Sequence, residues 1–249
     1  MQRLFLACAL GVTLATAGII QGIASAADKA EVIVLSTLHQ LHAETEGYSF
    51  ADLFDVIEQL HPDILAVELT AEDIESRRDQ STKQEYPRVV FPLLDKHDYD
   101  VVPLEPPQPL YDNLVGLFRK SQEDLSEQNP AGAESFNLYA ESLFEFLEER
   151  WVSPGAVNSL ATDILFESKH RFQSALFGDE EAQAWEGWNQ HFLQQILNTA
   201  KAHPDSRILA LVGAEHAYWL RSHLAGSEVV LLDTQRLLAD RKKGVRSDF

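Results

Sequence analysis

Two histidines follow two short segments of continuous apolar residues, and this placement suggests a reactive site. His39 comes shortly after the run 32–35 (Val-Ile-Val-Leu). His216 follows the run 208–212 (Ile-Leu-Ala-Leu-Val) across Gly213. A continuous apolar run of this length is typical of a strand that is buried on both faces in a parallel sheet. Because ligands bind at the carboxyl ends of such strands, we expect the two imidazoles at one edge of the sheet.

Two glutamates end two further predicted strands. Glu68 follows the apolar run 64–67, and Glu105 follows the strand predicted over 99–104. Imidazole and carboxylate groups together are typical ligands of a divalent first-row metal ion such as Zn, Mn, Fe or Co. Such an ion lowers the pKa of a bound water, and a glutamate that does not bind the metal can act as the general base. A salt bridge to the arginine pair 77–78 would equally explain Glu68.

Other ionisable residues near this group are secondary candidates, because each also has a structural explanation. His42 is more typical of an exposed loop residue than of a ligand. Glu215 points away from His216 if both residues begin a helix, and His216 itself could cap that helix or hydrogen-bond a neighbouring strand. His191 could line the cleft from a stripe of aromatic residues that is otherwise typical of a core. His170 is predicted at the surface.

The elements that must position these residues alternate between strands and helices. Strands are predicted over 31–38, 64–67, 99–104, 208–212 and 228–232, and helices over 50–60, 86–96, 214–224 and much of 110–202. A loop is predicted over 43–48, a solvated helix or loop over 71–84, and a polar tail from residue 235 onward. We therefore expect one α/β domain over 27–249, with a mainly parallel central sheet flanked by helices. Residues 108–203 are expected to form a helical insertion, or lid, before the last strands.

The amino terminus is typical of a secretory signal peptide over residues 1–26. Arg3 precedes a long apolar stretch, and Ala24-Ser25-Ala26 provides a cleavage site of small residues. An uncleaved membrane anchor is the alternative, since about 20 apolar residues can span a bilayer. Cys8 is the one cysteine of the chain and would be removed with the leader. We therefore expect an exported protein, periplasmic or extracellular, that is stabilised by its core without disulfides.

Charge and missing motifs exclude several classes of function. The formal net charge is −19 at pH 7. This charge repels nucleic acid and anionic lipid, so neither is an expected partner apart from a membrane that holds an uncleaved leader. The chain has no His-Glu-x-x-His metalloprotease motif, no Gly-x-Ser-x-Gly nucleophile motif, no phosphate loop and no dinucleotide fingerprint.

Four short segments resemble motifs of the TraB/GumN/Tiki family, which is grouped with the haem-binding ChaN proteins and the erythromycin esterases. The segments 36–39 (Ser-Thr-Leu-His) and 213–216 (Gly-Ala-Glu-His) are similar to the family's paired Gly-x-x-His motifs. The segments 64–70 and 99–105 resemble its second and third strands, each of which ends in an acidic residue. The order of the four segments agrees with the family across residues 31–233.

The resemblance implies an exported metal-dependent hydrolase that acts on a peptide or a small-molecule ester. It implies that His39, His216 and Glu68 bind a Zn, Mn or Co ion, with Glu68 and Glu105 as the catalytic carboxylates. Ser36 replaces the glycine of the first motif, and the segment 188–191 (Trp-Asn-Gln-His) replaces the usual arginine motif.

Two non-enzymatic alternatives remain open. The first is a haem-binding protein of the ChaN type, for which Tyr48, Tyr218 and His42 are the candidate ligands. The second is an interaction module whose ancestral site no longer functions.

Overall fold

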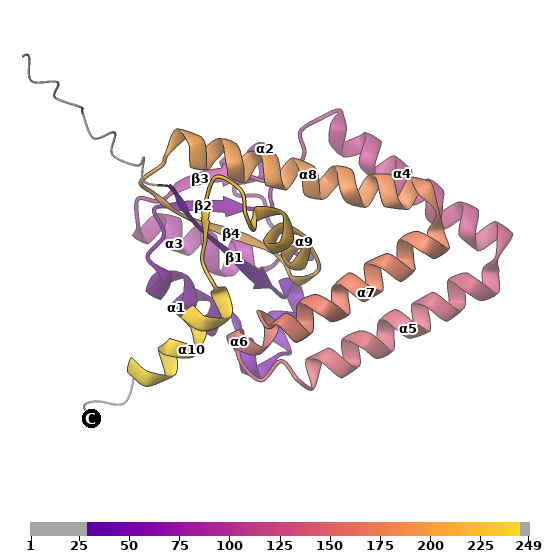
Figure 1. Cartoon of the computed structure of the whole chain (residues 1–249), viewed down its shortest axis with the longest axis horizontal. Coiled ribbons are helices and arrows are strands. Elements are labelled where there is room, and N and C mark those ends of the chain that lie inside the picture. Colours follow the sequence, from indigo (N-terminus) through magenta and orange to yellow (C-terminus); the bar gives the residue numbers. More distant parts are fainter. Residues whose placement is uncertain (1–28, 245–249) are drawn as a thin grey trace, which may run out of the picture.

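The computed structural model describes residues 29–244, and the predicted signal peptide lies outside them. The predicted α/β fold is confirmed: these residues contain a five-stranded parallel sheet in the order β3-β2-β4-β1-β5 (Figure 1). The strands are β1 (Glu31–Thr37), β2 (Ile64–Val67), β3 (Asp100–Pro103), β4 (Arg207–Gly213) and β5 (Val230–Leu231).

The register of the sheet brings the predicted site residues to one edge. β4 lies between β2 and β1, with Gly213 opposite Thr37 on one side and Leu211 opposite Val67 on the other. The carboxyl ends of the three strands are therefore nearly level. Because every side chain of β2 and nearly every one of β1 and β4 is buried, apolar residues fill these strands without alternation, as expected for a central parallel sheet.

Helices cover both faces of the sheet. Apolar residues of α1 (Phe50–Leu60), η3 (Tyr86–Val90), α3 (Phe91–Lys96) and α10 (Thr234–Gly244) pack on one face. Those of α8 (Asp179–Ala202) and α9 (Ala214–Leu224) pack on the other. The other helical segments are η1 (His39–Ala43), η2 (Glu46–Tyr48), α2 (Ala71–Ser76), α4 (Leu110–Gln128), α5 (Pro130–Glu148), α6 (Pro154–Val157) and α7 (Leu160–Phe177).

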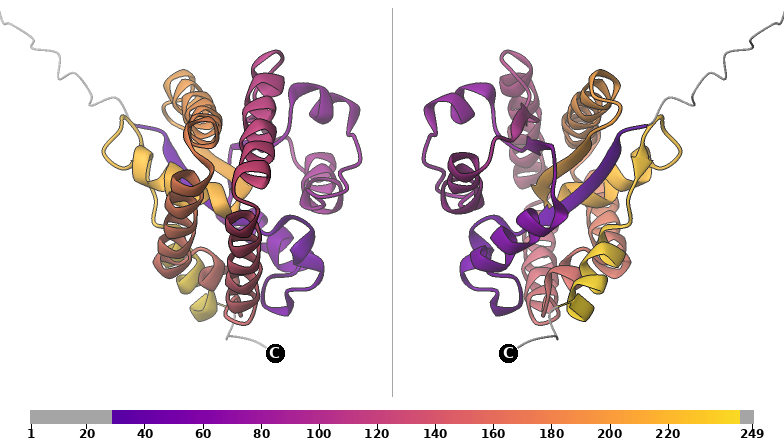
Figure 2. Two further views of the ribbon diagram at one scale, coloured as in Figure 1. Left: turned by 90° about the vertical axis from the view of Figure 1, so that its right-hand side faces the viewer. Right: turned by 90° about the vertical axis from the view of Figure 1, so that its left-hand side faces the viewer.

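The predicted helical insertion corresponds to α4 to α8, between β3 and β4. Four long helices extend from the sheet, with α4 beside α8 and α5 beside α7 (Figure 1). The left view of Figure 2 shows them from their far end. The insertion is also part of the main core. Leu143 and Phe166 join the apolar cluster on one face of the sheet, and Phe192 and Ile196 join the cluster on the other. Its inner ends therefore have fixed positions next to the strand ends.

Two local expectations were wrong. The predicted loop over 43–48 contains the turns η1 and η2, and the predicted polar tail forms α10, with Leu238 buried in the core. The segment 71–84 begins with the helix α2 and contains no buried residue, as expected, although the side chain of Lys83 is only 22% exposed. The predicted capping box of α1 is present, with reciprocal hydrogen bonds between Ser49 and Asp52.

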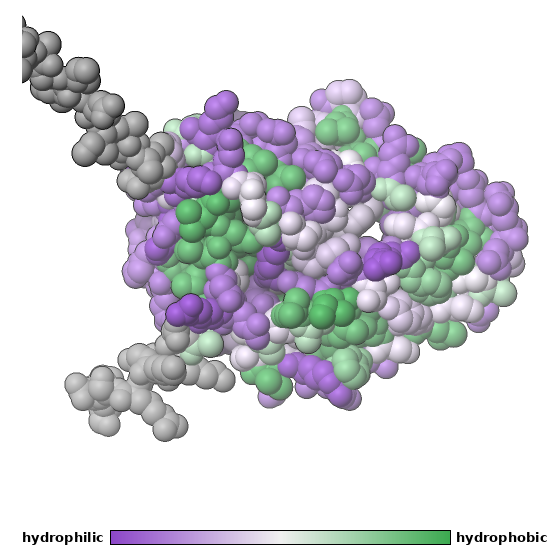
Figure 3. Space-filling view, in the orientation of Figure 1, coloured by the Kyte–Doolittle hydropathy of each residue, from purple (hydrophilic) through white to green (hydrophobic). Residues whose placement is uncertain are grey.

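The outer surface agrees with the acidic composition. Hydrophilic residues cover most of the face in Figure 3, with apolar patches between them that include the start of α7, where Leu160 and Ile164 are exposed. Within residues 29–244, none of the helices combines the length and the hydropathy needed to cross a bilayer.

Candidate functional site

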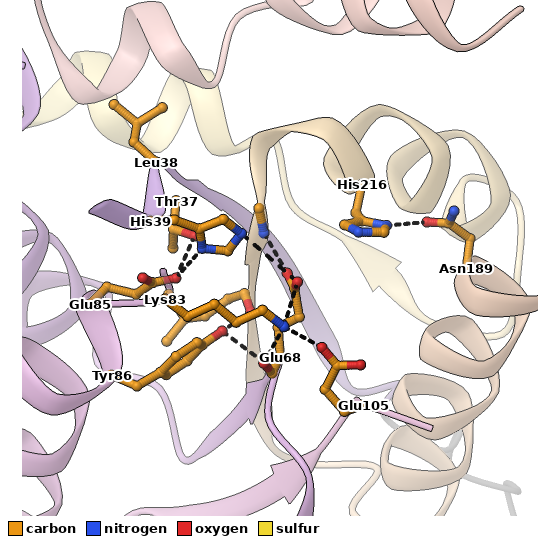
Figure 4. A network of polar contacts seen from close by, with 12 residues as sticks. Thr37, Leu38, His39, Glu68, Lys83, Glu85, Tyr86, Glu105, Asn189 and His216 are labelled. Carbon is orange, nitrogen blue, oxygen red and sulfur yellow. Dashed lines mark hydrogen bonds and ion pairs between the residues drawn. The ribbon is translucent and has the colours of Figure 1, made fainter. Parts of the chain in front are cut away.

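The carboxyl edge of the sheet brings together the four residues predicted from the strand ends, namely His39, Glu68, Glu105 and His216 (Figure 4). Two further charged residues, Lys83 and Glu85, enter the same site from the segment that precedes η3. The sequence analysis did not identify either of them.

His39 forms a close pair with the buried carboxylate of Glu85. The Nδ1 atom of His39 lies 2.7 Å from Oε1 of Glu85, and the same oxygen accepts a hydrogen bond of 3.0 Å from the hydroxyl of Thr37. The Nε2 atom of His39 lies 3.9 Å from Oε1 of Glu68. Burial alone would lower the pKa of His39, but the carboxylates of Glu85 and Glu68 outweigh it and raise the pKa above its ordinary value. Protonated His39 therefore has carboxylates on both sides of its ring.

The backbone of His39 is also unusual. His39 has φ 52°, in the left-handed region that non-glycine residues seldom adopt. Within residues 29–244, His61 and Arg77 are the other non-glycine residues with positive φ, and both follow the last turn of a helix, where this conformation is common. His39 instead begins η1, directly after β1. Its strained backbone is therefore consistent with a residue held in place for a function.

Glu68 is an ionised carboxylate surrounded by donors. Its Oε2 accepts a hydrogen bond of 2.7 Å from the backbone N–H of Gly213, and its Oε1 lies 2.9 Å from the ammonium of Lys83. Burial raises the pKa of Glu68, but the positive charges of Lys83 and His39 and the hydrogen bond from Gly213 outweigh this effect, so the net shift is downward. Tyr86 fixes the backbone here, because its hydroxyl accepts from the N–H of Glu68 at 2.8 Å.

Glu105 is the carboxylate with fewer donors. Its Oε1 accepts a hydrogen bond from Lys83, and its buried Oε2 has no hydrogen-bond partner among the described residues. Burial raises the pKa of Glu105, and the negative charge of Glu68 adds to that effect, while Lys83 opposes it. The two carboxylates therefore differ in protonation, with Glu68 ionised and Glu105 the one that more readily holds a proton.

His216 is a neutral imidazole with a defined tautomer. Its Nδ1 lies 2.9 Å from Oδ1 of Asn189, and the Nδ2 amide of Asn189 donates to the carbonyl of Trp185 at 2.8 Å. The amide therefore presents its oxygen to His216, so Nδ1 of His216 carries the hydrogen and Nε2 carries a lone pair. The ring of Trp185 stacks on His216 at 4.7 Å between centroids. Burial lowers the pKa of His216 to about 4.

Both histidines line one cavity of about 240 Å³ at the sheet edge. Phe144, Trp151 and Phe166 of the helical insertion supply an apolar wall. The first residues of α9 also line the cavity, and no side chain caps this end of the helix. The backbone N–H groups of its first turn therefore favour negative charge in the cavity. A second cavity of about 710 Å³ lies beside Glu68, Lys83 and Glu105.

The secondary candidates occupy different places. His42 is buried rather than exposed: its Nε2 accepts from the N–H of Leu38 at 2.9 Å, and its Nδ1 donates to the carbonyl of Tyr48 at 2.6 Å. Because both ring nitrogens of His42 are engaged, it has no position left for a haem iron. Burial lowers its pKa to about 4. His191 lines the larger cavity, apart from His216.

Glu215 is held by two residues of α7. Its Oε2 lies 2.7 Å from the ammonium of Lys169 and 2.8 Å from Nε2 of His170, which is buried rather than at the surface. These partners lower the pKa of Glu215 against the effect of burial, so it stays ionised. Tyr218, the third candidate haem ligand, is half-buried near this group, where its ring lies 5.6 Å from that of His170.

The implied metal ion does not fit the site as it is arranged. The ammonium of Lys83 already lies between the carboxylates of Glu68 and Glu105, and Nδ1 of His39 is occupied by Glu85. The described part of the chain holds no group of three or more His, Cys, Asp or Glu side chains placed to bind a metal ion. We therefore derive no chemical step through a metal ion.

Comparisons with known proteins give no indication of what the site does, so its interpretation depends on its geometry. The chain matches no family model, and no curated protein and no solved structure is significantly similar to it.

Proposed function

We propose that the protein is a hydrolase that cleaves an ester or peptide bond, with His216 as the general base and His39 as the general acid. One observation supports this most directly. The two imidazoles line the same cavity, and their surroundings shift their pKa values in opposite directions. A separation of this kind distinguishes the acid from the base in many hydrolytic sites.

The proposed reaction uses each group in its favoured protonation state. The lone pair on Nε2 of His216 accepts a proton from a water molecule as its oxygen attacks the carbonyl carbon. The bond to the leaving alcohol or amine then breaks, and Nε2 of His39 donates a proton to the leaving atom. Solvent returns both histidines to their starting states. The free N–H groups at the start of α9 stabilise the negative charge that develops on the carbonyl oxygen.

The shape of the cavity restricts the substrate. Ligand pockets usually have volumes of about 300 Å³ or more, and this cavity is smaller. Its wall of Phe144, Trp151 and Phe166 favours an apolar group. We therefore propose that the acyl part of the substrate is small and apolar. Export of the protein, as its leader predicts, would place this activity in the periplasm or outside the cell.

A substrate panel tests the proposal. The purified protein is assayed with aryl esters of increasing acyl length and with short peptides, before and after treatment with EDTA. We expect turnover of short-chain substrates that EDTA does not change. Absence of turnover across the panel would contradict the proposal. Activity that EDTA removes and Zn or Mn restores would favour the metal-dependent mechanism that the family resemblance implies.

Gly213 provides a more local test. A Cβ atom at this position would lie 2.6 Å from Nε2 of His39, although the backbone at φ −52° and ψ 143° accepts alanine. Gly213→Ala is therefore expected to displace the imidazole and to lower kcat/KM by about 10²-fold. The free energy of unfolding should fall by about 1 kcal/mol.

The matched control is Gly116→Ala, because a Cβ at Gly116 meets nothing within 4 Å. Kinetic assays and thermal unfolding are compared for the two variants. An unchanged kcat/KM in Gly213→Ala would show that the position of His39 does not matter for the reaction.

A further inference from the structure

We infer that the larger cavity is a second binding site, which takes a primary alkylammonium group, and that it holds the leaving part of the substrate. The second half of this inference rests on the proposed function, and the first half does not. The cavity has a volume of about 710 Å³. This volume lies within the range of about 300–1,000 Å³ that is usual for small-molecule sites.

A buried carboxylate oxygen without a donor lines this cavity. The side chain of Glu105 is only 6% exposed, and its Oε1 accepts a hydrogen bond from Lys83. Its Oε2 has no hydrogen-bond partner among the described residues, and Figure 4 shows this oxygen turned away from Lys83. A buried polar atom without a partner costs free energy, which a ligand that donates a hydrogen bond would recover. We therefore expect a donor group of the ligand at Oε2 of Glu105.

The ammonium of Lys83 is already engaged and does not attract an anion into the cavity. It has three N–H donors, and three oxygens lie around it. Two belong to Glu68, whose Oε1 lies at 2.9 Å and whose backbone carbonyl lies at 3.0 Å. The third is Oε1 of Glu105. Lys83 therefore has no donor left for a ligand.

The other charges around the cavity favour a cation. Arg78 pairs with both Glu72 and Asp73. Burial lowers the pKa of His191, so this residue adds no positive charge near neutral pH. Among the described residues that line the cavity, four are carboxylates and two are cations. Of the groups that can donate to Glu105, an ammonium is the one that also balances this excess of negative charge.

The cavity also offers apolar surface for a carbon chain. This surface comes from Leu69, Ala71, Pro103, Pro106, Pro107 and Tyr111. An ammonium at the end of a short alkyl chain would contact both this surface and Glu105.

The two cavities meet at the proposed proton donor. Thr82 lines both of them. Nε2 of His39, which lines the smaller cavity, lies 3.9 Å from Oε1 of Glu68, which lines the larger one. In the proposed reaction the acyl group occupies the smaller cavity, and the leaving atom receives its proton from Nε2 of His39. The leaving part then extends past Glu68 into the larger cavity.

Binding is measured first, without a reaction. Pentylamine and pentanol are titrated into the protein at constant ionic strength, and their affinities are measured by NMR. The two probes have the same chain length, but only the amine is charged near neutral pH. We expect the amine to bind at least about 10-fold more tightly than the alcohol. Glu105→Gln keeps the size of the side chain and removes its charge, so it should weaken amine binding by about 10-fold and leave alcohol binding unchanged.

Glu72→Gln is the matched control. Glu72 also lines the cavity, but its side chain is 79% exposed and pairs with Arg78. We expect its affinity for pentylamine to stay within about twofold of the wild type. An equal loss in the two variants would reveal only the general attraction of an acidic surface and would contradict a site at Glu105. Equal affinity of the wild type for the amine and the alcohol would also contradict it, and this comparison needs no variant.

The role in the reaction is tested separately, with two acetate esters whose leaving alcohols have the same length. We expect kcat/KM to be at least about 10-fold higher for the alcohol that ends in an ammonium, and this preference should disappear in Glu105→Gln. Amine binding without turnover of any ester would support the binding site and contradict the proposed hydrolase. Turnover without the preference would contradict a leaving-group site in this cavity.

Discussion

His39→Gln is expected to lower kcat/KM by about 10³-fold, because it removes the proton that the leaving group requires. Glutamine keeps a similar volume and a polar end but cannot transfer a proton. His39 pairs with the buried carboxylate of Glu85, so its replacement also weakens a charge-assisted hydrogen bond. We therefore expect the free energy of unfolding of this variant to fall by about 2 kcal/mol. Steady-state kinetics on the best ester of the panel, with chemical denaturation alongside, measures both quantities.

Glu85→Gln removes the negative charge beside His39 but keeps a side chain of nearly the same size and shape. The amide can still accept the hydrogen bond from Nδ1 of His39, but it no longer stabilises the imidazolium form. We expect kcat/KM near neutral pH to fall by about 10²-fold, less than in His39→Gln.

His203→Gln is the control for His39→Gln, because His203 is exposed at the end of α8. Activity of His39→Gln within a factor of about two of the wild type would rule out proton transfer by His39.

The residues of the site that could be predicted are those that follow apolar strands. Continuous apolar composition predicts buried strands over 32–35, 64–67 and 208–212. Parallel strands bring their carboxyl ends to one edge of the sheet. His39 and Glu68 therefore meet because of a pattern that is visible in the sequence. This reasoning locates residues at an edge, but it does not determine which side chains touch.

Lys83 and Glu85 could not be predicted in the same way. They lie in a polar segment without helical or alternating periodicity. Burial there depends on distant contacts with Thr37 of β1 and with the glutamates that follow β2 and β3. A charged residue near a helix start normally remains in solvent, so its type carries no signal of burial. The local indication is Tyr86, an aromatic residue that begins a buried helical turn and brings its charged neighbours inward.

The segment 188–191 shows how a difference from a family can have a structural role. Its sequence lacks the arginine motif that the resemblance implies, and Asn189 in its place orients His216. α10 was missed for a simpler reason: its polar composition hides Leu238, which packs on the sheet. In both cases one residue in a mostly polar stretch makes the decisive contact. The periodicity of the whole segment does not reveal such a residue.

The pH dependence of kcat/KM is expected to be bell-shaped, and each limb has its own residue. The base His216 must be neutral, and its pKa is lowered to about 4, so activity rises as the pH increases through about 4. The acid His39 must be protonated, and its pKa is raised above the ordinary value of about 6.5. Activity therefore falls at a pH above that value. The optimum lies between the two limbs.

Two variants should each shift one limb of the pH profile and leave the other limb in place. Glu85→Gln removes a charge that raises the pKa of His39, so the descending limb should move to lower pH while the ascending limb stays in place. Asn189→Asp adds a negative charge at Nδ1 of His216 and should move the ascending limb to higher pH. The profiles are recorded with one ester at constant ionic strength. If the wild-type activity instead rises through neutral pH, His39 acts as the base, and the roles of the two histidines are reversed.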